Sequence, residues 1–199
     1  LAADHPGLRF HGLAGDWGDA LDHLPEPTGP RAFTFLGSSI GNLTHREAVG
    51  FLRRIAARMD RGDALLLGVD RTKSPSVIEA AYNDGEGVTE AFNKNLLARA
   101  NRELGAEFPL HRFRHRAVYD RAEERIEMRL ESRDMRTVPI AGLDLEVTFG
   151  AGETIHTEWS HKYSVGTLTD LATSAGLAIV RVYSDPREWF SVLRLERAR

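Results

Sequence analysis

Hydrophobic and polar positions follow two different periods along the chain, and the changes of period divide it into elements. Compact apolar runs at 32–37 and 64–70 are typical of buried parallel strands. Between them, Thr44 and Glu47 form a capping box, and apolar residues then recur at helical spacing as far as Met59. A strand, a helix and a strand with short connections predict a βαβ unit of a doubly wound α/β sheet.

The pattern changes within residues 72–163. Two helices are predicted at 76–82 and 89–104. Strand-like alternation of apolar and polar residues then dominates, most clearly at 125–134 and 144–149. This alternation predicts an antiparallel sheet with one solvated face.

The last part of the chain returns to the α/β style, with a helix at 165–174 and strands at 177–185 and 189–196. The last two strands are so close in sequence that they are expected to pair antiparallel. We therefore divide the chain into a core, residues 1–71 and 164–199, and an inserted α+β lobe, residues 72–163. Residues 11–17 read as the end of another strand that runs into a loop.

Composition argues against several classes of function. The net charge is −3 and no basic stripe is visible, which argues against a nucleic-acid partner. The chain has no cysteine, which excludes disulfides and thiolate metal sites and fits a reducing cytoplasm. No apolar run reaches membrane-spanning length. The chain begins at Leu1 inside what reads as a structured unit, so we expect that the native protein has residues before it.

The loop GSSIGN at 37–42 follows a predicted strand, at the edge of an open α/β sheet where ligands bind. Gly37 and Gly41 let the backbone approach a ligand closely, and Asn42 offers both a donor and an acceptor. The alternative is an ordinary connection between a strand and a helix.

Two further candidates have equally plain alternatives. Asp16 and Trp17 combine a carboxylate with a stacking face, which suits an adenine ring, or they are a capping aspartate and a core tryptophan. Tyr82 ends a short predicted helix, where it either contacts a ligand or packs with its hydroxyl in solvent.

The segment TIHTEWSHKY at 154–163 holds the densest polar cluster. In a regular strand His156, Glu158, Ser160 and Lys162 share one face, with Glu158 and Ser160 about 7 Å apart. A charged acceptor beside a hydroxyl suits a neutral imidazole, which has one N–H and one lone-pair nitrogen. A solvated face is the alternative. His161 points to the other face and no H-x-x-x-H helix exists, so we predict no metal site.

Several blocks, in this order, resemble the L-histidine Nα-methyltransferases of ergothioneine biosynthesis. They are FLGSSIGNL, LLLGVD, AYNDGEGVTEAFNKNLL, EERIEMRLESR and IHTEWSHKY, and they cover nearly the whole chain. The resemblance implies a Rossmann-like class I methyltransferase core with a substrate lobe, and S-adenosylmethionine as cofactor. The final helix, strand and reversed strand fit the end of such a sheet.

The resemblance also implies roles for individual residues. Asn42 and Tyr82 hold the amino-acid end of histidine and act as the catalytic residues, Glu158 and Ser160 grip the imidazole, and Met128 lies near it. Asp16, Trp17 and Gly37 contact the cofactor. Either Tyr82 or a water molecule accepts the proton of the amine.

The family's glycine-rich cofactor loop and ribose-binding acidic residue lie upstream of the position of Leu1, so we expect a partial core that lacks its N-terminal strands. We expect a cytoplasmic monomer whose partner is histidine, and neither nucleic acid nor membrane. Two alternatives stay open. One is a methyltransferase for another amino-acid or indole amine, against which indole's lack of an acceptor nitrogen argues. The other is a substrate-binding fragment without catalysis.

Overall fold

The computed structural model describes residues 4–5 and 7–198. Its strands are β1 (Ala32–Phe35), β2 (Ala64–Asp70), β3 (Phe113–Asp120), β4 (Arg125–Ser132), β5 (Arg136–Ile140), β6 (Leu145–Phe149), β7 (Thr154–His161), β8 (Leu177–Ser184) and β9 (Phe190–Arg197). Its α-helices are α1 (Trp17–Ala20), α2 (His45–Arg58), α3 (Pro75–Tyr82), α4 (Val88–Leu104) and α5 (Val165–Ser174). Short 3₁₀ helices are η1 (Leu21–His23), η2 (Ser39–Asn42), η3 (Leu110–Arg112) and η4 (Ala141–Leu143).

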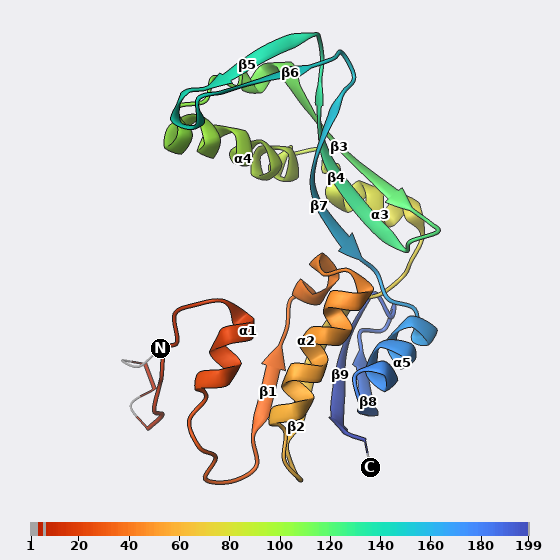
Figure 1. Cartoon of the computed structure of the whole chain (residues 1–199). Helices are drawn as coiled ribbons and strands as arrows, with labels where there is room; N and C mark the ends of the chain where they lie inside the picture. Colours follow the sequence, from red (N-terminus) through yellow and green to blue (C-terminus); the bar gives the residue numbers. More distant parts are fainter. Residues whose placement is uncertain (1–3, 6, 199) are drawn as a thin grey trace.

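A four-stranded sheet with the order β1-β2-β9-β8 forms the lower part of the molecule (Figure 1). β1 and β2 are parallel, whereas β9 runs antiparallel to both of its neighbours, β2 and β8. The predicted βαβ unit and the predicted antiparallel pair at the end of the chain are therefore confirmed. The reversed strand lies between β2 and β8, which run in the same direction, so the sheet is mixed.

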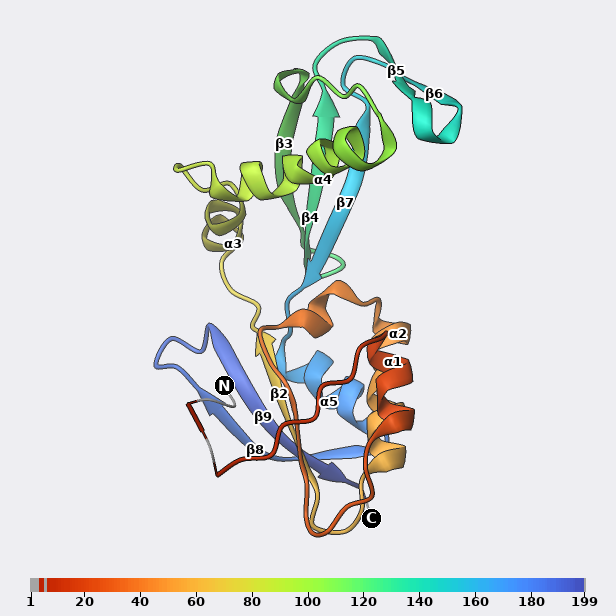
Figure 2. The ribbon, with the colours of Figure 1, turned by 90° about the vertical axis from the view of Figure 1, so that its left-hand side faces the viewer.

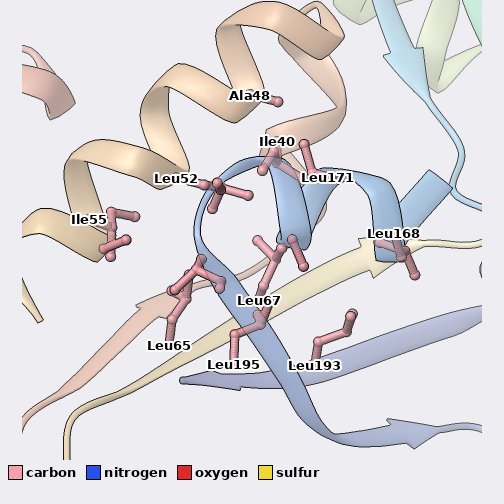
Figure 3. Packing of buried hydrophobic residues seen from close by; sticks show 14 of the residues in the cluster. Ile40, Ala48, Leu52, Ile55, Leu65, Leu67, Leu168, Leu171, Leu193 and Leu195 are labelled. Carbon is pink, nitrogen blue, oxygen red and sulfur yellow. The ribbon is translucent and has the colours of Figure 1, made fainter. Parts of the chain in front are cut away.

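Helices α2 and α5 cover one face of this sheet and enclose its core (Figure 3). The capping box begins α2 as predicted, because the Thr44 side chain accepts from the Glu47 N–H and the Glu47 carboxylate accepts from the Thr44 N–H. Leu52 from α2 and Leu171 from α5 are fully buried against Leu65 and Leu195 of the sheet. Full burial of one such side chain stabilises the fold by about 1.5–3 kcal/mol.

The upper part of the molecule consists of the sheet β3-β4-β7, the hairpin β5-β6 and helices α3 and α4 (Figures 1 and 2). All pairs in these sheets are antiparallel, as the alternating pattern predicts. Apolar side chains of β4 lie under α3 and α4, while its opposite face carries ion pairs such as Glu127 with Arg125 and Arg129. The face predicted to be solvated is thus lined by paired charges.

A β-bulge in β7 corrects one prediction. Met128 pairs with Glu158, but the next residue of β4, Arg129, pairs with His156, so Thr157 is an extra residue in β7. The bulge places His156 on the opposite face from Glu158, where its ring lies 5.0 Å from that of Trp159. The predicted shared face of Glu158 and Ser160 is kept, while the predicted place of His156 is wrong.

A second correction concerns residues 11–17. They form no strand in the described coordinates, and the segment instead leads into α1, whose first turn is capped by the Asp16 side chain. A strand needs a partner for its backbone groups, and none lies beside this segment among the described residues.

The lower and upper parts meet where η2 packs on β7. Three consecutive carbonyls of η2 accept hydrogen bonds from ring donors at alternate positions: Ile40 from Tyr163 Oη (3.3 Å), Gly41 from His161 Nδ1 (2.9 Å) and Asn42 from Trp159 Nε1 (3.0 Å). The Ile40 carbonyl also accepts from the N–H of Leu43, the residue that caps η2 (3.1 Å). His161 and Trp159 bind the next two carbonyls, at the end of the helix, where acceptors lack a partner within the helix. β7 therefore fixes the position of the loop that follows β1.

The strands of the two parts come from the residue ranges assigned above to core and lobe. Whether residues 72–163 fold as a unit stays a prediction.

Gly41 allows the close approach of η2 to β7. A Cβ atom on Gly41 would lie 2.9 Å from the carbonyl oxygen and 3.2 Å from the nitrogen of His161, both backbone atoms. We predict that Gly41→Ala lowers the free energy of unfolding by about 1–3 kcal/mol, because the backbone must shift. Urea titration followed by circular dichroism measures the change.

Gly50→Ala is the matched control for that experiment. Gly50 lies inside α2 and has no atom within 4 Å of an added Cβ, so alanine is expected to raise stability by up to about 1 kcal/mol. Equal stability changes in the two variants would contradict the close packing of η2 on β7.

Candidate functional site

A cavity of about 410 Å³ lies at the carboxyl ends of β1 and β2, where α3 and β7 reach the lower sheet. This is the edge of an open α/β sheet at which ligands are expected. It brings together four residues predicted for the substrate and one predicted for the cofactor. The lining residues are Gly37, Ser38, Ser39, Asn42, Asp70, Tyr82, Glu158, Ser160 and Phe190.

β7 supplies one wall of this cavity. In the sheet, Glu158 pairs with Met128 of β4 and Ser160 pairs with Ile126. Both side chains line the cavity, on the face of β7 opposite the one that contacts η2. One face of the strand therefore lines the cavity and the other contacts η2, because alternate residues point to opposite sides. Glu158 is half-buried and Ser160 is buried, so the wall is shielded from bulk solvent.

η2 supplies the facing wall through Asn42. The Asn42 side chain lies close to the Glu158 carboxyl and favours its charged form. Burial raises the pKa of the Glu158 carboxyl above its usual range, while the charge of Lys162 and the Asn42 side chain act in the opposite direction. The carboxylate is therefore a strong acceptor that gains from any further donor brought by a ligand.

Tyr82 is held at the end of α3 by hydrogen bonds to β3. The next residue, Asn83, donates to the Ala117 carbonyl (2.9 Å) and accepts from the Ala117 N–H (3.1 Å). The Tyr82 carbonyl lies 2.8 Å from Nε2 of His115, whose Nδ1 contacts Asn93. These bonds fix the backbone of Tyr82 so that its side chain enters the cavity.

Lys162 lies behind the cavity wall, with its side chain 1 % exposed. Its ammonium contacts the Tyr82 hydroxyl at 2.8 Å, the Ser160 hydroxyl at 3.0 Å and the Asp70 carboxylate at 2.9 Å. Asp70 ends β2 and also pairs with Lys73. A buried charge needs such partners, because an unpaired one is costly in the protein interior.

Met128 does not line the cavity. It is buried beneath the cavity, in a small cluster with Ile78, Ala117 and Ile126, against which Tyr82 packs. Its pairing with Glu158 places it directly beside the wall that carries the carboxylate. The structure therefore places Met128 beside two lining residues, Tyr82 and Glu158.

The residues predicted for the cofactor are less closely grouped. Gly37 lines the cavity with a left-handed backbone, φ 74°, which favours glycine. Asp16 lies outside the cavity lining and accepts from the Gly18 N–H at 2.9 Å as the cap of α1. The side chain of Trp17 lies outside the described part of the structure, so its predicted contact stays a prediction, as does that of Asp16.

Asp70 and Lys162 are site residues to which the sequence analysis gives no role. The signal for Asp70 is its place as the last residue of a buried strand, at the same sheet edge as the GSSIGN loop. The signal for Lys162 is its alternation with Ser160, which the sequence does show. Its contact with Tyr82 joins residues 80 positions apart and has no local signal.

A second cavity, of about 360 Å³, lies between the β3-β4 turn and helices α2 and α5 and contains none of the predicted site residues. Among the described residues, no group of three or more His, Asp or Glu side chains is placed to hold a metal ion. None of the described helices has both the length and the apolar character needed to cross a membrane.

Known proteins resemble this chain over nearly its whole length. The family described as "Histidine-specific methyltransferase, SAM-dependent" matches residues 1–197. The histidine N-alpha-methyltransferase of Mycolicibacterium smegmatis is 42% identical over 186 residues, which cover 94% of this chain and 58% of that protein. The protein of the same name from Mycobacterium tuberculosis is 41% identical, covering 93% of this chain and 57% of its own length.

A more distant relative is the L-tryptophan methyltransferase of Psilocybe serbica, 29% identical over 92% of this chain and 54% of its own length. The chain thus spans somewhat more than half the length of each of these three relatives. The family match over residues 1–197 and the two relatives above 40% identity give one conclusion: the chain belongs to the SAM-dependent, histidine-specific methyltransferases.

Proposed function

We propose that the protein methylates the α-amino group of L-histidine with S-adenosylmethionine as methyl donor, giving the trimethylated betaine, hercynine, of ergothioneine biosynthesis. The observation that carries this proposal is the shared cavity wall of Glu158 and Ser160, which faces Asn42 and Tyr82. The names of the two mycobacterial relatives, and of the ergothioneine biosynthesis protein 1 of Schizosaccharomyces pombe, support the substrate and the pathway.

The proposed recognition of the ring follows from the groups on β7. The Glu158 carboxylate only accepts hydrogen bonds, so it binds the N–H of a neutral imidazole. Ser160 donates to the second ring nitrogen. A buried site built for these bonds rejects rings that lack them, because its own polar groups are then left unpaired.

Asn42 and Tyr82 are proposed to hold the amino-acid end of the substrate. Asn42 from η2 and Tyr82 from α3 line the same cavity as Glu158. The amide and the hydroxyl together offer donors for a carboxylate and an acceptor for an amine. With the ring anchored on β7, this arrangement sets the direction in which the amine points.

The residues around Gly37 fit one end of the cofactor. Gly37 and Ser38 both have left-handed backbone, φ 74° and φ 58°, so the loop exposes its backbone groups to the cavity beside Asn42. Asp16, Trp17 and Gly37 would hold the cofactor. When bound, S-adenosylmethionine supplies an electrophilic methyl group on a sulfonium.

The chemistry required of the protein is mainly positioning. The nucleophile is the neutral amine, so the α-amino group must lose its proton before it attacks the methyl carbon. Holding the nitrogen lone pair in line with the methyl carbon and the sulfur supplies most of the acceleration. Asn42 and Tyr82 orient the nitrogen, and Glu158 with Ser160 fix the other end of the molecule.

A tryptophan-type substrate is the alternative that the Psilocybe relative brings forward. An indole N–H satisfies Glu158, but indole has no lone-pair nitrogen for Ser160, so the polar wall favours histidine. A cytoplasmic, monomeric enzyme without nucleic-acid partners is part of the same proposal and rests on the composition of the chain.

Incubation of the full-length protein with S-adenosylmethionine and either histidine or tryptophan tests the proposal. Mass spectrometry is expected to find trimethylated histidine, and no methylated tryptophan at equal concentration. Methylation of tryptophan in preference to histidine would contradict the proposed substrate. Absence of methylation with both, from protein that binds the cofactor, would contradict the activity.

The Glu158→Gln variant is expected to bind histidine more weakly without being less stable. Loss of a charge-assisted hydrogen bond of about 1.5–3 kcal/mol is expected to weaken histidine binding about tenfold or more, with S-adenosylmethionine binding nearly unchanged. Because the folded pKa of Glu158 is raised, its ionisation reduces stability as the pH rises from the ordinary carboxyl range through the folded pKa. The variant should therefore unfold at an equal or higher temperature near neutral pH, and this difference should vanish in acid.

Isothermal titration calorimetry and thermal unfolding measure the two effects. Glu146→Gln, on the exposed surface of β6, is the matched control and should change neither. Equal weakening of histidine and cofactor binding in Glu158→Gln would count against a carboxylate that anchors the ring.

A further inference from the structure

The ammonium of Lys162 has a complete set of partners. A lysine ammonium has three N–H donors and no acceptor, and the three atoms around Nζ are the Tyr82 hydroxyl, the Ser160 hydroxyl and the Asp70 carboxylate. All three lie within 3.0 Å of it. Lys162 does not line the cavity itself, so any effect on a ligand passes through these neighbours.

These contacts fix the direction of two hydrogen bonds. A hydroxyl group has one proton and two lone pairs, and it can face a ligand either as donor or as acceptor. Since Lys162 can only donate, the oxygens of Ser160 and Tyr82 must both accept from it. In the described part of the chain neither hydroxyl has a further hydrogen-bond partner, and both line the cavity. Their protons are therefore free to point at a bound molecule.

We propose that Lys162 is a positioning residue. By donating to the hydroxyl oxygens of Ser160 and Tyr82, it makes both hydroxyls hydrogen-bond donors toward the ligand and leaves Glu158 as the acceptor. The inference deepens the proposed function and rests on it. One acceptor beside one donor matches the neutral imidazole, with its N–H on Glu158 and its lone pair on Ser160. The same direction makes Tyr82 a donor to the substrate carboxylate rather than the base that takes the proton of the amine.

Asp70 keeps the ammonium in place. Its carboxylate bridges Lys162 and Lys73, and its backbone N–H donates to the Ser38 hydroxyl at 2.8 Å. The direction of the bonds is thus fixed from the end of β2, by Asp70, which itself lines the cavity. A lysine that served only to join β7 to β2 would need the Asp70 contact alone, and would have no effect on which ring is preferred.

Ring selectivity at one pH tests the proposal in the full-length protein. Two ligands are compared by calorimetry above the ordinary ring pKa of about 6.5: histidine, and pyrrolylalanine, whose ring keeps an N–H but has a C–H in place of the second nitrogen. The wild type should prefer histidine by about 100-fold, since pyrrole leaves the Ser160 proton unpaired. In Lys162→Met the Ser160 hydroxyl can turn, and the preference should fall by about tenfold.

Lys73→Met is the matched control, because it removes the other cation on Asp70 and touches neither hydroxyl. It should keep the wild-type preference. An unchanged preference in Lys162→Met, beside normal binding by the wild type, would overturn the role of Lys162 and leave the proposed function standing. Failure of the wild type to bind histidine at all would instead contradict the proposed function.

A measurement without any Lys162 variant covers the case in which Lys162→Met does not fold. Histidine labelled with ¹⁵N in its ring should show, by NMR in the complex, one protonated and one unprotonated nitrogen. Replacement of Ser160 by alanine should then shift the signal of the unprotonated nitrogen, which has lost its donor. A doubly protonated bound ring, or a shift confined to the protonated nitrogen, would overturn the proposal.

Discussion

Docking of η2 on β7 is the interaction on which the rest of the site depends. Ring donors at alternate positions of the 154–163 segment each reach one carbonyl of a short 3₁₀ helix: Trp159, His161 and Tyr163 on Asn42, Gly41 and Ile40. Burial raises the pKa of the Tyr163 hydroxyl, which therefore stays protonated as a donor. Because Gly41 has no side chain, the two backbones approach closely enough for all three bonds to form.

The opposite face of the same strand carries the polar groups of the cavity. Glu158 and Ser160 face the ligand, and Lys162 lies behind them with Asp70 as its counter-ion. Such a set of buried charges adds little to stability, since desolvation offsets much of the attraction between them. Under the proposed function this arrangement serves recognition, because it gives one acceptor and oriented donors to a small planar ring.

Much of the fold could be predicted from local pattern. The capping box of Thr44 and Glu47, the apolar strands and the alternation in β4 are properties of neighbouring residues, and the structure has them. The bulge at Thr157 could not be predicted, because it depends on how β7 pairs with a strand about 30 positions away. Regular alternation therefore predicts the wrong face for His156, whereas it predicts the observed face for Glu158 and Ser160, which lie beyond the bulge.

The candidate site, too, could be predicted from the sequence only in part. The GSSIGN loop and the Glu158–Ser160 pair could be read from the sequence, since each lies within one element and the family resemblance connects them. The contact of Lys162 with Tyr82 joins two elements that only the tertiary fold brings together, so neither residue type nor spacing reveals it. For Asp16, capping of helix α1 accounts for the observed contact, and its cofactor role stays a prediction.

The central claim is that one face of β7 builds the site by docking η2 and the other face binds the substrate ring. Trp159→Phe tests it most directly, because this change removes the donor to Asn42 on the face that points away from the cavity. Calorimetry is predicted to show histidine affinity reduced by about three- to tenfold, the cost of one hydrogen bond transmitted through the loop. Unchanged histidine affinity in a folded Trp159→Phe protein would contradict the account.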